Sequence, residues 1–320
     1  MIVSAEGLTR EFVVGRRRAR RRITAVDGID LAIEPGETVG FLGPNGAGKS
    51  TTIKMLTGIL VPTSGHLTVC GLDPVASRRE LARRIGVVFG QRSALWWDLP
   101  LLDSFELLRT IHRVSPADYR VRLERCTEVL GLADFLATPV RQLSLGQRMR
   151  GEVTAALLHA PPLLVLDEPT VGLDLVSKER LRAFLREANA ADGVTILLTT
   201  HDLPDVERLC RRVVVIDNGR VVADDALDVL RRRSSGPREL VVDLAEPAGE
   251  PGLTGLPGVL ATSVEAGGLR CRFTFETGTS AAALVAEIMR RVEVRDVALV
   301  EPSIEDLVRS LYASAPRGSA

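Results

Sequence analysis

The sequence predicts a large α/β domain followed by a small α+β unit, and three observations support this prediction. Short apolar runs rich in β-branched residues recur along residues 1 to about 235, with helical patterns between them. A glycine-rich segment at 43–51 connects one of these runs to a helical pattern. The segment RRRSSGPREL at 231–240 interrupts the regular patterns. We therefore expect one domain at 1–235 and a second at 236–320.

The strands expected in the first domain are continuous apolar runs, which are typical of a sheet covered on both faces. They are TVGFLG (38–43), IGVVF (85–89), LLVLD (163–167), TILLTT (195–200) and VVVID (213–217). The segment RVVVIDNGRVVADD adds a hairpin with Asn218 and Gly219 as its tight turn, so the predicted sheet is mixed. Residues 96–150 hold helical patterns without a clear strand, which indicates an inserted helical subdomain.

Beyond the boundary, the patterns change to those of a small α+β accessory domain. The segments ELVVDL, LRCRFTFET and VEVRDVALV are typical of strands. The segments SAAALVAEIMRRV and SIEDLVRSLY are typical of helices. The sequence does not indicate the role of this second domain.

The composition narrows the class of protein. The chain of 320 residues carries 41 basic and 41 acidic residues, which gives no overall attraction to nucleic acid or to a membrane. Its four cysteines are scattered without a C-x-x-C pair, as expected of free thiols in a reducing compartment. No apolar run reaches the ~18 residues of a membrane span, and the N-terminus is too polar for a signal peptide. We expect an intracellular protein that meets a membrane only peripherally.

The glycine-rich segment fits the phosphate-loop pattern G-x-x-x-x-G-K-[ST] between an expected strand and an expected helix. Its glycines allow backbone N–H groups to surround phosphate oxygens. We expect Lys49 to reach the β and γ phosphates, Ser50 to ligate Mg²⁺ and Thr51 to donate to the α phosphate. The residues of the proposed loop are Gly43, Pro44, Asn45, Gly46, Ala47, Gly48, Lys49, Ser50 and Thr51.

Polar residues follow three more of the expected strands, where α/β sheets bind their ligands. Asp167 ends the run LLVLD and would bind Mg²⁺ directly or through water, and Glu168 would polarise the attacking water. His201 follows TILLTT and either contacts the γ phosphate or has a structural role. Gln91 follows IGVVFG and is a candidate to touch Mg²⁺ and the water.

The order of these elements resembles an ATP-binding cassette (ABC) over residues 1 to about 235. The resemblance implies a P-loop NTPase cassette, with a RecA-like core and a helical subdomain, that binds ATP and Mg²⁺ and hydrolyses ATP. VGLD at 171–174 resembles the D-loop of this family, with Asp174 as the matching residue. Phe12 stands where the family places an aromatic residue, usually Tyr, that stacks on adenine. The alternative for Phe12 is a core aromatic at a strand end.

LSLGQ at 143–147 is similar to the signature motif of the same family. The resemblance implies that two cassettes pack head to tail, with each ATP between the P-loop of one subunit and the signature of the other. Ser144, Gly146 and Gln147 would then bind the partner's ATP, because a helix N-terminus offers N–H donors and a positive dipole end. We expect a second ABC subunit as partner, in a homodimer or with a similar cassette.

The segment GVVFGQRSALWWDLPLLDSFELL resembles subunits that drive ABC-2-type exporters. This resemblance implies a transmembrane permease as partner and a peripheral position at the cytoplasmic face of the cell membrane. Trp96 and Trp97 would dock the permease or pack within the helical subdomain. DNA-repair cassettes carry long coiled coils and translation factors carry tandem cassettes, and this chain has neither. The alternative function is a soluble ATP-switched regulator that has no permease.

A basic run, GRRRARRR at 15–22, is expected in a loop between the first two strands. A solvated loop is the favoured interpretation, and contact with anionic lipid or with the permease is the alternative. Binding to nucleic acid is a weaker option because no recognition module accompanies the run. The arginines of this run are Arg16, Arg17, Arg18, Arg20, Arg21 and Arg22.

Overall fold

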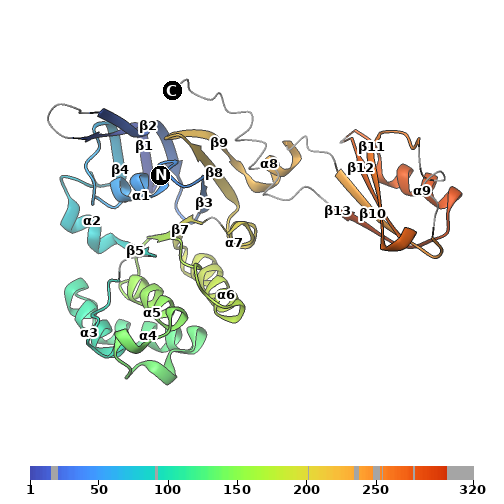
Figure 1. Cartoon of the computed structure of the whole chain (residues 1–320). Coiled ribbons are helices and arrows are strands. Elements are labelled where there is room, and N and C mark those ends of the chain that lie inside the picture. The colour runs from blue at the N-terminus through green and yellow to red at the C-terminus, as the bar shows by residue number, and fades with distance from the viewer. Residues whose placement is uncertain are drawn as a thin grey trace. The chain divides into compact units, whose positions relative to one another are not determined.

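The computed structural model divides the chain into two compact units, Met1–Leu227 and Asp228–Ala320 (Figure 1). The expected boundary near residue 235 stays a prediction. The residues that the structure describes are 1–15, 21–90, 93–200, 202–233, 238–247, 253, 255–276 and 278–300.

A six-stranded mixed sheet forms the centre of the first unit, in the order β5-β6-β7-β3-β8-β9. Strands β5 to β8 in this order pair in parallel, and only β9 runs antiparallel, against β8. The mixed α/β fold predicted from the sequence is therefore confirmed. The strands are β5 (Ile85–Phe89), β6 (Leu163–Asp167), β7 (Thr195–Thr199), β3 (Thr38–Leu42), β8 (Arg212–Asp217) and β9 (Arg220–Ala226).

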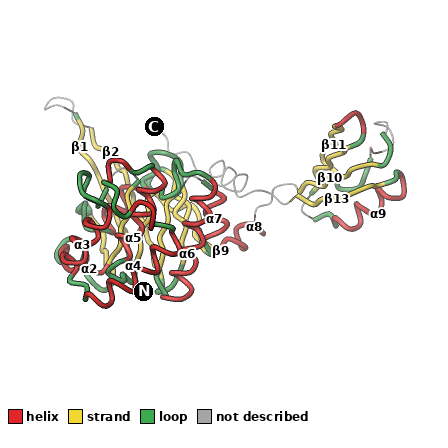
Figure 2. The backbone as a smooth tube through the Cα atoms, turned by 90° about the horizontal axis from the view of Figure 1, so that it is seen from below, coloured by secondary structure: helices red, strands yellow, loops and turns green. Residues whose placement is uncertain are grey.

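A second, antiparallel sheet has the order β2-β1-β4 and was not foreseen from the sequence as a separate layer. Its strands are β1 (Val3–Val14), β2 (Arg21–Ile33) and β4 (Ser64–Val69). Figure 2 shows β1 and β2 running together as a ribbon. Arg21 and Arg22 belong to β2, so the expectation that the whole basic run is a loop is wrong for these two. Arg16, Arg17, Arg18 and Arg20 lie outside the described residues.

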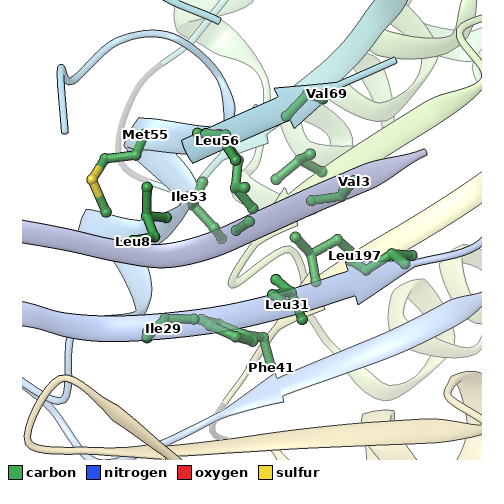
Figure 3. Close-up of a cluster of buried hydrophobic side chains, with 14 of the residues drawn as sticks. Val3, Leu8, Ile29, Leu31, Phe41, Ile53, Met55, Leu56, Val69 and Leu197 are labelled. Carbon is green, nitrogen blue, oxygen red and sulfur yellow. The ribbon is translucent and has the colours of Figure 1, made fainter. Parts of the chain in front are cut away.

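Helix α1 (Lys49–Leu56) lies between the two sheets. One core joins Leu8 of β1, Ile53 of α1 and Phe41 of β3, all at most 1% exposed (Figure 3). Burying side chains of this size stabilises the fold by roughly 1.5–3 kcal/mol each. The core therefore fixes the start of α1 against the end of β3, where the glycine-rich loop lies.

The helical patterns expected at 96–150 correspond to three helices and two short 3-10 turns. Helix α4 begins at Pro116, where Ser115 accepts a hydrogen bond from the Asp118 N–H, and ends before Gly131 in a left-handed conformation (φ 61°). These features are typical helix caps. The elements are α3 (Leu101–His112), α4 (Pro116–Leu130), η1 (Ala133–Phe135), η2 (Val140–Gln142) and α5 (Leu145–Leu157).

The remaining helices of this unit lead into strands of the mixed sheet. Helix α2 (Arg78–Arg84) precedes β5, α6 (Leu175–Asp192) lies between β6 and β7, and α7 (Leu203–Leu209) lies between β7 and β8. Across the described part of the chain, no helix has the length and apolar character needed to cross a bilayer.

The second unit contains a four-stranded antiparallel sheet in the order β11-β12-β10-β13. Phe273 and Phe275 of β12 pack with Leu284 and Ile288 of α9 in a core of its own. β11 was missed from the sequence, and the helix expected at 303–312 lies outside the described residues. The elements are α8 (Leu227–Arg233), β10 (Arg238–Leu244), β11 (Val259–Glu265), η4 (Ala266–Gly268), β12 (Arg270–Phe275), α9 (Ala281–Arg291) and β13 (Val294–Val300).

Candidate nucleotide-binding site

The carboxyl ends of the parallel strands meet at one edge of the mixed sheet. In the register of the sheet, Asp167 at the end of β6 pairs with Phe89 of β5 and with Thr199 of β7. The glycine-rich loop leaves β3, which is the next strand along this edge. Gln91 and His201 themselves lie outside the described residues.

The glycine-rich loop needs glycine at two positions for steric reasons. A Cβ on Gly43 would lie 2.5 Å from the carbonyl oxygen of Ile216, and one on Gly48 would lie 2.5 Å from that of Ala25. Gly48 also has a φ of 107°, which side chains rarely allow. The loop can therefore approach β8 and β2 closely only because both residues lack a side chain.

The turn between β8 and β9 supports this loop through backbone hydrogen bonds. The Gly219 N–H donates to the Ala47 carbonyl oxygen (2.9 Å), and the Asp27 N–H donates to the Gly219 carbonyl oxygen (2.8 Å). Asn218 and Gly219 both have positive φ, 46° and 79°, as the predicted tight turn requires. A hairpin far along the chain thus holds the backbone of the loop.

Lys49 is buried at the first turn of α1 and its ammonium group faces the loop. Its Nζ donates to the carbonyl oxygens of Gly43 (2.5 Å) and Pro44 (3.1 Å). Burial lowers the pKa of Lys49, and the negative charges of Glu168 and Asp167 oppose that shift. The Lys49 ammonium group is therefore close to the carboxylates of Glu168 and Asp167, and all three residues line the same cavity.

A cavity of about 800 Å³ opens above the loop. Asp167 and Ser50 both line it, and their carboxylate and hydroxyl oxygens are the hard ligands that Mg²⁺ takes alongside substrate phosphates. Phe12 does not line the cavity, and the guanidinium of Arg10 lies 4.7 Å from the centre of its ring. The lining residues are Ala25, Gly43, Pro44, Asn45, Gly46, Gly48, Lys49, Ser50, Thr51, Lys54, Ile59, Phe89, Gly90, Leu145, Met149, Asp167, Glu168 and Val171.

The two acidic residues after β6 are held by β7. Asp167 Oδ1 accepts a hydrogen bond from Thr199 Oγ1 (2.6 Å), and the Glu168 N–H donates to the Thr199 carbonyl oxygen (3.0 Å). Glu168 has a φ of 56°, a left-handed conformation that costs a side-chain-bearing residue roughly 1 kcal/mol. The surrounding loop must therefore impose this conformation.

The start of α5 is an exposed and well-capped helix N-terminus. Ser144 Oγ accepts from the Gln147 N–H (3.2 Å), and Gln147 Oε1 accepts from the Ser144 N–H (2.8 Å), which forms a capping box. A Cβ on Gly146 would touch Ser177 Oγ at 3.2 Å, so α5 begins close to the start of α6. Among the described residues, Leu145 and Met149 border the cavity, whereas Ser144, Gly146 and Gln147 do not.

Asp174 caps α6 through both carboxylate oxygens. Oδ1 accepts from the Ser177 N–H (2.8 Å) and Oδ2 accepts from the Ser177 hydroxyl (2.8 Å). These hydrogen bonds from Ser177 lower the pKa of the exposed Asp174 carboxyl. Asp174 therefore remains ionised near neutral pH and lies beside the first turn of α5.

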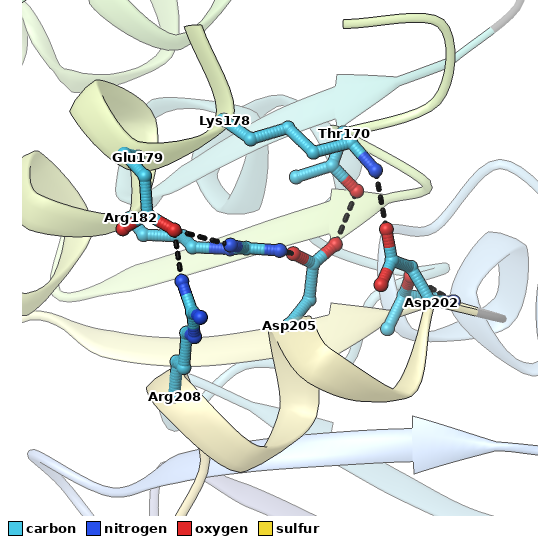
Figure 4. Close-up of polar contacts among 8 residues, drawn as sticks. Thr170, Lys178, Glu179, Arg182, Asp202, Asp205 and Arg208 are labelled. Carbon is cyan, nitrogen blue, oxygen red and sulfur yellow. Dashed lines mark hydrogen bonds and ion pairs between the residues drawn. The ribbon is translucent and has the colours of Figure 1, made fainter. Parts of the chain in front are cut away.

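A buried polar cluster next to these residues was missed from the sequence. It joins Thr170, Arg182 and Asp205, which are 1%, 3% and 0% exposed (Figure 4). No short sequence pattern singles out this cluster, because its three residues lie on separate segments that meet only in the fold.

Comparisons with known proteins agree with this geometry. Residues 26–171 match the family model described as ABC transporter. The ABC transporter ATP-binding protein NatA of Bacillus subtilis is 33% identical over 211 residues, which cover 66% of this chain and 85% of that protein. A daunorubicin resistance ATP-binding protein of Streptomyces coeruleorubidus is 34% identical over 311 residues, which cover 95% of this chain and 93% of that protein. Nod factor export ATP-binding protein I of Ralstonia nicotianae is 37% identical over 278 residues, which cover 83% and 79%.

Solved structures give the same result for the fold. The ATP-binding subunit of an ABC transporter superposes with a TM-score of 0.64 at 29% identity, covering 73% of this chain and 93% of that one. A dimeric ATP-binding cassette in a post-hydrolysis state, bound to ADP and phosphate, superposes with a TM-score of 0.63 at 29% identity, covering 70% and 98%. The sequence relatives and the solved cassettes agree with the arrangement of the candidate site, so the chain belongs to the ATP-binding cassette family of transporter ATP-binding proteins and is an ATPase.

Proposed function

We propose that this chain is the ATP-hydrolysing subunit of an exporter, in which two cassettes close over ATP and drive a separate permease. The relatives named for Nod factor export and daunorubicin resistance support an export function. The dimeric cassette among the structural neighbours supports the closure of two copies. This subunit would work at the cytoplasmic face of the membrane, in contact with an ABC-2-type permease.

The observation that supports a dimer is a group of exposed apolar side chains around the N-terminus of α5, which we call the apolar rim. Leu145, Val171, Leu175 and Val176 are 38%, 44%, 72% and 61% exposed. Exposed apolar groups that gather in one region beside polar residues mark interaction surfaces on soluble proteins. Ser144 and Asp174 are exposed within the same region and would meet the partner's ATP and P-loop.

Within each cassette, the residues around the cavity have distinct proposed roles. Lys49 neutralises the β and γ phosphates, and the loop N–H groups bind the phosphate oxygens. Ser50 and Asp167 would hold Mg²⁺, which neutralises developing charge on the phosphates. Glu168 orients and polarises the attacking water, and its position between Lys49 and the β7 backbone supports this role. Gln91 and His201 keep their proposed roles beside the water and the γ phosphate.

The permease contact is proposed for the segment that leads into α3. Trp96 and Trp97 are 38% and 52% exposed, and the Arg148 guanidinium lies 5.7 Å from the centre of the Trp97 ring. Exposed tryptophan supplies large contact area at an interface. This exposure favours docking over burial in the core of the helical subdomain.

The shared site is tested with Glu168→Gln, which should bind ATP but hydrolyse it slower by about 100-fold or more because the water loses its polarising charge. ATP should then hold two copies together in size-exclusion chromatography. Adding Ser144→Arg should abolish this dimer while each monomer keeps its ATP affinity in calorimetry. If Ser144→Arg weakens monomer binding as strongly as Lys49→Ala does, the signature acts on its own subunit's ATP and the shared site is wrong.

Ser115→Arg is the matched control for this experiment. Ser115 caps α4 as Ser144 caps α5, accepting a hydrogen bond from a residue three positions later. Ser115→Arg therefore removes a helix cap outside the apolar rim and should leave the ATP-dependent dimer intact. Loss of the dimer in both variants would mean that helix stability alone explains the effect.

The exporter role is tested separately, by purifying the protein from its native membranes in mild detergent. A polytopic membrane protein should accompany the wild type and be lost on Trp97→Ser. A protein that purifies without such a partner, and still dimerises on ATP, would instead be a soluble ATP-switched regulator.

A further inference from the structure

Asp205 of α7 has a buried carboxylate that contacts two other segments, helix α6 and the loop that contains Thr170 (Figure 4). Its Oδ2 accepts a hydrogen bond from the hydroxyl of Thr170, and its Oδ1 accepts from Arg182 Nε (2.7 Å) and from Arg182 Nη2. Asp205 is 0% exposed and Arg182 is 3% exposed. The carboxylate therefore uses both oxygens on fixed partners away from solvent.

Arg182 is itself held in one orientation. Its Nη1 donates to Glu179 Oε1 (2.7 Å), and the same oxygen accepts from Arg208 of α7. One helical turn earlier, Lys178 of α6 pairs with Asp202 just before α7. Among the described residues, three ion pairs thus connect α6 with α7 and its N-cap: Lys178–Asp202, Arg182–Asp205 and Glu179–Arg208. The pair that contains Asp205 is the most buried of them.

The third segment is the loop that carries Glu168. Thr170 lies two residues after Glu168 and is 1% exposed. The Glu168 N–H is fixed by the Thr199 carbonyl oxygen, and the Leu173 N–H donates to the Thr170 carbonyl oxygen (3.2 Å). Because Glu168 has a positive φ of 56°, its side chain keeps its direction only while the residues after it are held as well. The bond from Thr170 to Asp205 provides that restraint.

Each of these three segments leaves the candidate site. Helix α6 begins directly after its N-cap Asp174, α7 begins at Leu203, shortly after the end of β7, and the Thr170 loop follows Glu168. A buried ion pair is a poor source of stability, because desolvation of the two charges offsets their attraction. A buried carboxylate that connects three segments at the candidate site is better suited to fix their relative positions than to raise the free energy of unfolding.

We infer that Asp205 is a positioning residue for ATP hydrolysis, which aligns Glu168 by holding Thr170 against Arg182. This inference rests on the proposed role of Glu168 as the residue that polarises water. Asp205 does not line the cavity. It therefore acts on the rate of the chemical step through Thr170 and not by contact with the nucleotide. Binding of ATP to the P-loop does not depend on it.

The test compares Thr170→Val with Thr170→Ser in the full-length protein. Valine keeps the shape and removes the hydroxyl, whereas serine keeps the hydroxyl that Asp205 accepts from. Thr170→Val should lower kcat by about 10-fold to 100-fold, as expected when a group that orients a catalytic residue is lost. Its ATP affinity in calorimetry should be unchanged, and Thr170→Ser should recover most of the rate. A folded Thr170→Val protein with wild-type kcat would overturn the inference.

Asp205→Asn and the double variant Thr170→Val with Asp205→Asn complete a mutant cycle. If Asp205 acts through Thr170, the double variant should lose no more of kcat than the worse single variant. Losses that multiply would show independent effects and overturn the inference. If Asp205→Asn does not fold, because the Arg182 charge is left buried, the pair of Thr170 variants still decides.

Asp224→Asn is the control for the loss of an aspartate–arginine pair. Asp224 accepts from Arg212 Nε (2.7 Å) and Nη2 (2.8 Å) on strands β8 and β9, away from the cavity lining. It should leave kcat unchanged. Glu168→Gln is measured in parallel, and wild-type hydrolysis by that variant would mean that the proposed catalytic role of Glu168, rather than the positioning by Asp205, has failed.

Discussion

At the scale of single residues, two opposing effects act on the pKa of the buried Lys49 ammonium group. Removal from water disfavours its charge, and Glu168 and Asp167 favour it. The group already occupies hydrogen bonds to the carbonyls of Gly43 and Pro44, so it is oriented before any ligand arrives. A cation held in this way is well placed to receive phosphate oxygens.

Lys49→Ala should lower the affinity for ATP by about 100-fold or more, since truncating one partner of a desolvated charge pair costs roughly 2–5 kcal/mol. Isothermal calorimetry with ATP measures the loss, and thermal unfolding checks that the variant is folded. Affinity equal to that of the wild type would contradict the assignment of the loop.

The contiguous part of the candidate site was predictable from the sequence, and the dispersed part was not. Gly43 to Thr51 are neighbours in the chain, so their chemistry is visible as a pattern, and Asp167 and Glu168 end a recognisable apolar run. Asp205 meets Thr170 and Arg182 only after α6 and α7 have packed. No short pattern records a contact between residues so far apart. Phe12 was predicted from family position alone, and its stacking on adenine stays a prediction.

At the scale of elements, α5 connects the signature to the segment that follows residues 91 and 92. The buried carboxylate of Glu152 accepts hydrogen bonds from the Ser93 hydroxyl and from the Ala94 N–H (3.0 Å). Burial raises the pKa of Glu152, and these two hydrogen bonds oppose the shift. The helix that begins at Ser144 thus fixes the approach to Trp96 and Trp97.

Glu152→Ala should loosen this segment, because the Ser93 hydroxyl and the Ala94 N–H both lose the acceptor that fixes them to α5. Trp96 and Trp97 are the only two tryptophans of the chain, so their fluorescence reports on it directly. The emission should shift to longer wavelength in the folded variant, and Glu152→Gln should shift it less because the amide oxygen still accepts. Unchanged emission in Glu152→Ala would mean that the segment is held by other contacts.

A stacked histidine pair joins the helical subdomain to β5. The rings of His112 and His159 have centroids 4.0 Å apart, and His159 Nε2 lies 3.1 Å from the Ile85 carbonyl oxygen. That nitrogen carries a hydrogen, because a carbonyl only accepts. Burial, together with His112 and Arg122, lowers the pKa of His159 to about 4, and the hydrogen bond to the Ile85 carbonyl opposes this shift. Both rings are therefore neutral at pH 7, His112 also having a lowered pKa through burial and Arg83.

Acid should weaken the contact between His159 and β5 in a defined pH range. Between about 6.5 and about 4 the unfolded chain binds a proton at His159 that the folded chain does not, so the free energy of unfolding falls as the pH drops. The loss should approach about 2–3 kcal/mol at the lower end of the range. His159→Gln retains a donor for Ile85 and should show a shallower decline between pH 7 and pH 5 in urea titrations. An identical slope in both proteins would contradict this assignment.

The five parallel strands of the mixed sheet were predicted closely because each is a largely apolar run with most of its residues buried. β11 was missed because most of its residues are exposed, so its sequence VLATSVE has no strong pattern. The separate β2-β1-β4 sheet was missed because β1 and β2 mix exposed and buried residues irregularly, with several shifts of register. Periodicity identifies strands with a consistent buried face and fails for such strands.

At the scale of the whole molecule, the two units have separate hydrophobic cores. We therefore expect two unfolding transitions in scanning calorimetry rather than one, since separate domains need not unfold cooperatively. Saturation with ADP and Mg²⁺ to about 100 times the dissociation constant should stabilise only the first unit, by about 2.7 kcal/mol. A chain ended after residue 237 should keep that ligand-sensitive transition and lose the other. A single transition that shifts as a whole would show one cooperative body.

The turn at Asn218 and Gly219 has a consequence for genetics. Gly219 holds the Ala47 carbonyl oxygen, and a Cβ in its place would lie 3.0 Å from the Ala25 carbonyl oxygen at a φ of 79°. Any side chain there would push the hairpin off the phosphate loop without touching nucleotide. In a saturation mutagenesis screen for loss of ATP binding, the substitutions recovered should form two clusters that are far apart in the gene. One cluster should lie in the phosphate loop and the other at the β8–β9 hairpin. Second-site revertants of Gly219 alleles should then map to the strand around Ala25, because that backbone is the surface against which the turn is pressed.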